Sequence, residues 1–173
     1  MKTSRPSTKH MTILALFTTI ALAIYYVESL LPPLVPIPGI KLGLANVITL
    51  ILIKNSSFKD AFFVLLMRIL LAAFLFGQAM SLLYSLSGGL FGLLAMFFIN
   101  KFLHGSFSGI TGIFGALFHN LGQLCVAMLI VSSTAPIAYL PLFILSSMIT
   151  GLFTGLCAKY ASLFLVHNFH QFS

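Results

Sequence analysis

The sequence predicts an all-α, polytopic membrane protein built as a bundle of six transmembrane helices. Of its 173 residues, 60% are hydrophobic and only 6% are charged. A water-soluble domain of this size could not bury so many hydrophobic side chains. Apolar runs also recur along the whole chain at lengths near the roughly 20 residues that a helix needs to cross a hydrocarbon core. Both observations exclude a soluble protein.

The first two predicted spans are separated by a segment that resists helix formation. Residues 1–10 are basic and polar, and the first apolar run covers residues 11–31. Residues 32–39 (PPLVPIPG) contain four prolines and a glycine, which predict a loop or a short re-entrant segment. Residues 41–53 follow as an apolar run of only 13 residues. This run either continues the re-entrant loop or forms the second span together with part of that loop.

The remaining chain divides into four longer spans and a tail. Arg68 interrupts the third span, and Gly88, Gly89 and Gly92 allow close helix contacts in the fourth. We expect a juxtamembrane amphipathic tail at residues 161–173, because His167 and His170 have no further metal ligand nearby. The four predicted spans cover residues 58–77, 81–102, 107–131 and 136–160. Residues 1–10, 11–160 and 161–173 are thus expected to form an N-terminal segment, a six-span membrane domain and a C-terminal tail.

Positive charges predict the orientation of these spans. If six spans cross, one side carries seven basic residues, namely Lys2, Arg5, Lys9, Lys54, Lys59, Lys101 and Lys159. The other side carries only Lys41, and Arg68 lies within the membrane. The positive-inside rule then predicts that residues 1–10 and the C-terminal tail both face the cytoplasm.

Polar residues from four spans fall in the central and outer layers of the predicted bundle. Such residues are costly in a bilayer unless they face a partner or a wet cavity. His119 and Gln123 are four positions apart and share one helix face. The two cations, Lys41 and Arg68, outnumber one acid, so a carboxylate, phosphate or polarised carbonyl would suit the region. The candidate ligand-binding residues are Glu28, Lys41, Asn46, Arg68, Gln78, His119, Asn120 and Gln123.

A structural interpretation of the same residues remains open at this point. Glu28 would then pair with Arg68 or Lys41, and the polar residues of the fifth span would bond neighbouring helices. A stripe of small residues in the first span, Ala15, Thr19 and Ala23, either docks a partner helix or packs internally. The glycines at 109, 112, 115, 151 and 155 favour internal packing of the last two spans.

Several function classes are excluded by what the sequence lacks. It contains two acids, Glu28 and Asp60, and no GxxxxGK[ST], HExxH or DDxxD motif, so we expect no catalytic residue, metal site or cofactor. The basic residues are scattered rather than clustered, which argues against nucleic acid as a partner. Cys125 and Cys157 lie in apolar runs without a CxxC pattern, and are interpreted as small buried hydrophobic residues.

The segments YVESLLPPLVPIPGIKLGLANVITL, LLMRILLA, LYSLSGGL, GALFHNLGQL and LPLFILSSMITGLFTGL resemble a bacterial membrane family labelled Gx transporter or heptaprenyl diphosphate synthase component I. The resemblance covers nearly all the chain after residue 11. That family is similar to the S components of energy-coupling factor (ECF) transporters, which are six-helix proteins that bind a vitamin-like substrate from outside. They work with a transmembrane T subunit and two ATPases.

The resemblance implies a multi-pass protein of the bacterial cytoplasmic membrane, and it adds Pro38, Gly39 and Gly43 as loop or lid residues. Three functions follow as hypotheses. The first is an S-component-like subunit that captures a small anionic or vitamin-, flavin- or quinone-precursor-like ligand, with Ala15, Thr19 and Ala23 contacting an ATP-driven partner. The second is a non-catalytic membrane subunit of a prenyl diphosphate synthase or quinone pathway. The third is a subunit of a flavin-based electron transfer system.

Overall fold

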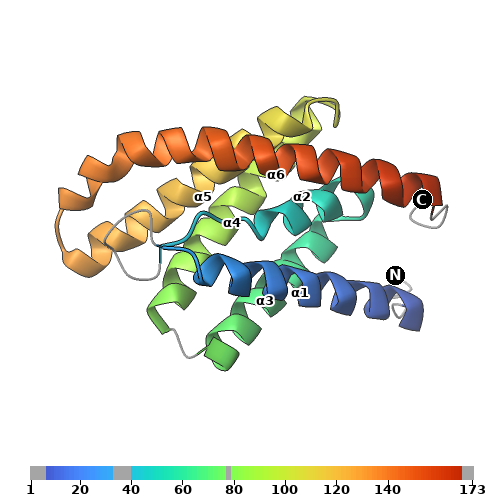
Figure 1. The fold of residues 1–173 in the computed structure, drawn as a ribbon, viewed down its shortest axis with the longest axis horizontal. Helices are drawn as coiled ribbons and strands as arrows, with labels where there is room; N and C mark the ends of the chain where they lie inside the picture. The colour runs from blue at the N-terminus through green and yellow to red at the C-terminus, as the bar shows by residue number, and fades with distance from the viewer. Residues whose placement is uncertain (1–6, 33–39, 77–78, 169–173) are drawn as a thin grey trace, which may run out of the picture.

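The computed structural model describes residues 7–32, 40–76 and 79–168, and these residues form helices joined by short turns (Figure 1). No strand occurs in these three ranges. The predicted all-α class is therefore confirmed. The elements are α1 (Thr8–Ser29), α2 (Asn46–Asn55), α3 (Phe58–Phe76), α4 (Ala79–Phe102), α5 (Ser108–Val131), the 3-10 helix η1 (Ala135–Tyr139) and α6 (Leu140–Asn168).

Four of the described helical segments are long and apolar enough to cross a membrane, which supports a multi-pass membrane protein. They are Thr8–Ser29, Met80–Phe102, Ser108–Val131 and Ala135–Leu165. The 19 residues of α3 include Lys59, Asp60 and Arg68, which gives this helix more charged residues than any of the four. The count of six spans therefore stays a prediction.

The predicted second span is only partly helical. The helix α2 begins at Asn46 and has ten residues, so it extends over about 15 Å, half of a hydrocarbon core. Before it, the chain turns at Gly43, whose φ of +82° lies in the left-handed region that glycine adopts without a steric cost. Residues 41–45 thus form a turn, and α2 is a half-length helix inside the bundle.

The last helix is longer than the sequence predicts. After η1, α6 runs without a break from Leu140 to Asn168, past the expected end at Tyr160. Ser162, beyond that end, accepts a 2.7 Å hydrogen bond from the side-chain amide of Asn55. The predicted tail therefore begins as a continuation of α6, while His170 and the His167 side chain lie outside the described residues.

Glycines bring α4, α5 and α6 into close contact. A Cβ atom added to Gly112 of α5 would lie 2.1 Å from the carbonyl oxygen of Gly151 in α6 and 2.7 Å from the Gly155 nitrogen. On the other side of α5, a Cβ atom on Gly92 of α4 would lie 3.0 Å from the Gly115 oxygen. These contacts confirm the predicted internal packing of the glycines in these helices.

Hydrogen bonds tie together one end of the bundle, where most of the lysines lie. The His10 ring on α1 lies 3.0 Å from the Asp60 carboxylate on α3. Lys54 at the end of α2 donates to the Gly105 carbonyl and to the Ser108 hydroxyl, in the joint between α4 and α5. In Figure 1 the start of α1 and the end of α6 lie at this same end. Lys41, near the end of α1, is the only described lysine at the opposite end.

Candidate functional site

The carboxylate of Glu28 holds the turn before α2 by its backbone. One oxygen of Glu28 accepts a 2.6 Å hydrogen bond from the Gly43 amide, and the other accepts a 3.0 Å bond from the Leu44 amide. The Glu28 side chain is buried at the end of α1, and the described residues offer it no lysine or arginine nitrogen within 4.0 Å. Both carboxylate oxygens of Glu28 therefore bind main-chain amides rather than a cation.

Gly43 lets this turn pack against α5. A Cβ atom added at Gly43 would lie 2.7 and 2.8 Å from two atoms of the His119 ring, and 2.9 Å from the Asn46 amide nitrogen. Any side chain here would collide with the ring, in addition to straining a positive φ. Gly43 is therefore needed for its small size and its conformation, and it brings the start of α2 next to His119.

A relay of hydrogen bonds links the turn to α5. The backbone amide of Lys41 donates to Oε1 of Gln123 over 3.3 Å, and Nε2 of Gln123 lies 2.9 Å from Nε2 of His119. Because Oε1 of Gln123 is the acceptor, its Nε2 is the donor, so Nε2 of His119 must accept. His119 is thereby assigned as a neutral imidazole with its proton on Nδ1, which faces Gly88 of α4.

Two cations gather around the ring of Tyr25. The ammonium nitrogen of Lys41 lies 3.4 Å from the centre of the Tyr25 ring, and the guanidinium carbon of Arg68 lies 5.7 Å from it. The Tyr25 hydroxyl pairs with Ser81 of α4 over 2.6 Å, which fixes the ring. Tyr25 and Arg68 are both buried, so the ring face gives these cations a cation–π partner away from water.

Four buried nitrogen atoms in this region lack a hydrogen-bond partner. They are Nζ of Lys41, Nδ2 of Asn46, Nη2 of Arg68 and Nδ1 of His119. Buried donors are normally satisfied, because an unpaired one costs free energy. All four groups donate, while the nearby carboxylate and the Gln123 carbonyl are already engaged. The site therefore has surplus donors and a need for acceptors.

Asn120 lies on the other side of α5. Its amide nitrogen is 2.9 Å from the Ser147 hydroxyl, 3.3 Å from the Ser146 hydroxyl and 3.4 Å from the Phe143 carbonyl, all on α6. This amide serves the contact between α5 and α6. The structure thus brings together Glu28, Lys41, Gly43, Asn46, Arg68, His119 and Gln123, and it directs the Asn120 amide to a different interface.

The other residues singled out in the sequence are either not described by the structure or lie away from the site around Tyr25. Gln78, Pro38 and Gly39 lie outside the described residues. Ala15, Thr19 and Ala23 are all exposed on α1, so this stripe is not used for packing within the described residues. The interpretation of both cysteines as buried was wrong. Cys125 is exposed and Cys157 is half-buried, because their positions on α5 and α6 turn them toward the outside of the bundle.

Tyr25 is the site residue that sequence reasoning missed. It precedes Glu28 by three positions, which places both side chains on one face of α1. That spacing was the available signal. It was hidden because Tyr26 is adjacent, and only the structure separates the buried Tyr25 from Tyr26, which is 47% exposed.

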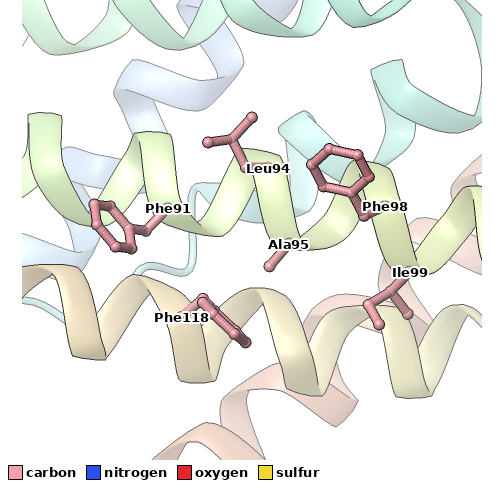
Figure 2. Close-up of a pocket in the computed structure, with 6 residues that line it drawn as sticks. All are labelled: Phe91, Leu94, Ala95, Phe98, Ile99 and Phe118. Carbon is pink, nitrogen blue, oxygen red and sulfur yellow. The ribbon is translucent and has the colours of Figure 1, made fainter.

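An apolar pocket of about 300 Å³ lies between α4 and α5. Figure 2 shows Phe91, Leu94 and Phe98 on α4 and Phe118 on the neighbouring α5. These four side chains are 39–62% exposed, as expected for a surface that contacts lipid. Its lining contains no hydrogen-bonding side chain, so this pocket is separate in chemistry from the site around Tyr25.

The described residues contain no cluster of three or more potential metal ligands.

A protein-family model described as heptaprenyl diphosphate synthase component I matches residues 17–161. This range includes every described residue of the site around Tyr25. No curated protein and no solved structure matches the chain.

Proposed function

We propose that this protein, which belongs to the heptaprenyl diphosphate synthase component I family, is a non-catalytic membrane subunit that binds an anionic organic ligand. The observation that carries this proposal is the surplus of donors, because Lys41, Asn46 and Arg68 each have a buried nitrogen without an acceptor. A carboxylate or phosphate offers only acceptors and carries the complementary charge. Such a group would satisfy the donors that the fold leaves unpaired.

The ligand is proposed to enter from the outer side of the membrane. The site lies at the end of the bundle opposite Lys54, Lys59, Lys101 and Lys159, and the positive-inside rule assigns that lysine-rich end to the cytoplasm. This assignment supports six spans with both termini inside the cell. The half-length α2, which begins beside the site, resembles in its length the broken helices at which membrane transporters bind substrates.

Uptake of the ligand would need an ATP-driven partner, because the sequence has no nucleotide-binding loop. The exposed stripe of Ala15, Thr19 and Ala23 on α1 supports a contact with the transmembrane subunit of such a partner, since small residues let helices approach closely. In this proposal the protein is an S-component-like subunit of a transporter in the bacterial cytoplasmic membrane.

Anion binding is tested by comparing Arg68→Met with Lys101→Met in purified protein. Both variants lose one positive charge, but Lys101 is exposed at the opposite end of the bundle. Thermal stabilisation in detergent is measured with a panel of organic carboxylates and phosphates. We expect stabilisation of the wild type and of Lys101→Met, and at least a hundredfold loss of affinity in folded Arg68→Met, because a buried charge-assisted contact is removed.

Equal anion affinity in Arg68→Met and the wild type would remove Arg68 from the site and overturn the proposal. Thermal unfolding in the absence of ligand checks that the variant is folded. Mass spectrometry of small molecules that co-purify with the wild type, and are missing from Arg68→Met, then identifies the natural ligand.

A second candidate function follows from the family description, which implies a catalytic prenyl diphosphate synthase subunit as partner. Lys59, Lys101 and Lys159 are exposed at the proposed cytoplasmic end and would contact that subunit. Changing these three lysines to glutamate should abolish its co-purification, whereas Arg68→Met should have no effect. If the lysine changes leave co-purification intact, this surface is not the contact.

A further inference from the structure

The charges of the site around Tyr25 can be counted completely. Lys41 and Arg68 each contribute one positive charge. Both oxygens of Glu28 accept backbone amides, which favours the ionised form of the carboxylate over the protonated form, so Glu28 is counted with one negative charge. His119 is neutral, because its Nε2 accepts from Gln123. The sum is one positive charge.

Among the residues that the structure describes, no other charged side chain lies at this end of the bundle. Around the site, α2 has no charged residue before Lys54, α4 has none before Lys101 and α6 has none before Lys159, and these lysines lie at the opposite end of the bundle. The two internal segments outside the described residues, 33–39 and 77–78, contain only apolar residues, proline, glycine and Gln78. The count therefore depends only on groups whose positions are described.

Resting on the proposed anion-binding function, we infer that the ligand carries a single negative charge and is a carboxylic acid rather than a phosphate monoester or a diphosphate. A buried site is most stable when its charges balance, because uncompensated charge is costly at low dielectric constant. One carboxylate brings the site to zero. A phosphate monoester dianion would leave an excess negative charge, and a diphosphate would leave more.

The chemistry of the donors points the same way. A prenyl diphosphate is normally held through Mg²⁺, which requires free carboxylate oxygens. Glu28 is the carboxylate of this site, and both its oxygens are engaged by the Gly43 and Leu44 amides. The site thus offers direct cationic donors to a metal-free anion. The diphosphate substrate of a catalytic partner would bind elsewhere.

A series of probes with one ten-carbon chain and different head groups tests this inference. Geraniol, geranic acid, geranyl monophosphate and geranyl diphosphate carry heads of increasing negative charge. Their affinities are measured with the purified full-length protein by titration calorimetry at pH 7.5 without Mg²⁺. We expect geranic acid to bind at least tenfold more tightly than each of the other three probes.

Two variants change the charge of the site in opposite directions. Arg68→Gln lowers the sum to zero, so the preference for geranic acid over geraniol should fall at least tenfold. Glu28→Gln raises the sum to two positive charges, so the preference should move toward the monophosphate. The readout is the ratio of affinities between probes within each variant, which a general loss of affinity does not change.

The result that overturns the single-charge inference differs from the result that overturns the anion-binding function. If the wild type binds the diphosphate most tightly, and this binding is lost in Arg68→Gln, the single-charge inference is wrong while the anion-binding function stands. If no probe binds in an Arg68-dependent way, both proposals are overturned. If Glu28→Gln does not fold, the Arg68→Gln ratios decide the test alone.

Discussion

The two sides of α5 use polar groups in opposite ways. On the side that faces α6, Asn120 has three acceptor atoms within 3.4 Å, and Gly112 touches the α6 backbone. On the side that faces α4 and the Gly43 turn, His119 and Gln123 form a relay to Lys41, and the donors beside it on Lys41, Asn46 and Arg68 remain unpaired.

This difference separates assembly from binding. An interface that only holds helices together gains by pairing each polar group and filling each space. A binding site instead keeps groups that its ligand will pair, and the free protein carries the cost of leaving them unpaired. The α6 side of α5 fits the first description, and the Tyr25 side fits the second. Substitutions on the α6 side should therefore destabilise the protein, whereas removing an unpaired donor on the Tyr25 side should change its stability little or increase it.

The largest effect is expected from Gly112→Ala on the α6 side. The added Cβ atom would lie 2.1 Å from the Gly151 oxygen, and a backbone atom cannot move away without shifting the helix. We expect a loss of about 3 kcal/mol in unfolding free energy, measured by denaturation in mixed micelles. The matched control is Gly109→Ala, whose Cβ atom would meet only the flexible Leu152 side chain at 3.2 Å. Equal losses in both variants would contradict tight packing at Gly112.

The sequence predicted much of this arrangement, and the reasons for its gaps are physical. Composition and run length predicted the helical membrane fold, because the bilayer demands long apolar helices. Depth along each span placed Glu28, Lys41, Arg68, His119 and Gln123 in the central and outer layers of the bundle, and a shared polar pocket was the simplest arrangement for them. Depth does not fix the rotation of a helix about its axis, so the sequence did not separate Asn120 from His119.

The next effect compares two asparagines. Asn120→Leu removes an amide with three partners, and we expect it to lose about 2 kcal/mol of stability while anion affinity is unchanged. Asn46→Leu removes an amide whose nitrogen has no partner, and we expect a stability change below about 1 kcal/mol with a clear loss of anion affinity. Denaturation and ligand titration of both variants provide the test. A reversed pattern would show that the two sides of α5 do not differ in this way.

Arg68→Met should stabilise the protein, in contrast to Gly112→Ala and Asn120→Leu, which should destabilise it. Without ligand, the guanidinium is buried with an unpaired nitrogen, so an apolar side chain of similar length should stabilise the protein by about 1 kcal/mol. Lys54→Met is the control, because Lys54 donates to the Gly105 carbonyl and the Ser108 hydroxyl, and its loss should be destabilising. Denaturation of both variants in ligand-free micelles measures the sign. A destabilised Arg68→Met would mean that the contact of Arg68 with the Tyr25 ring outweighs the cost of its unpaired nitrogen.

The smallest effect is expected at Tyr25, where the ring and the hydroxyl have separable roles. Tyr25→Phe keeps the ring beside Lys41 and Arg68 and removes only the hydrogen bond to Ser81, whose hydroxyl can turn to a helix carbonyl. We expect it to cost less than about 1 kcal/mol and to leave anion affinity within a factor of three. Tyr25→Leu also removes the cation–π partner, so both cations lose an anchor and anion affinity should fall further. Ligand titration of the two variants compares them. If the two variants have the same anion affinity, the ring does not position the cations. The unpaired donors of Lys41 and Arg68 would then account for anion binding without it.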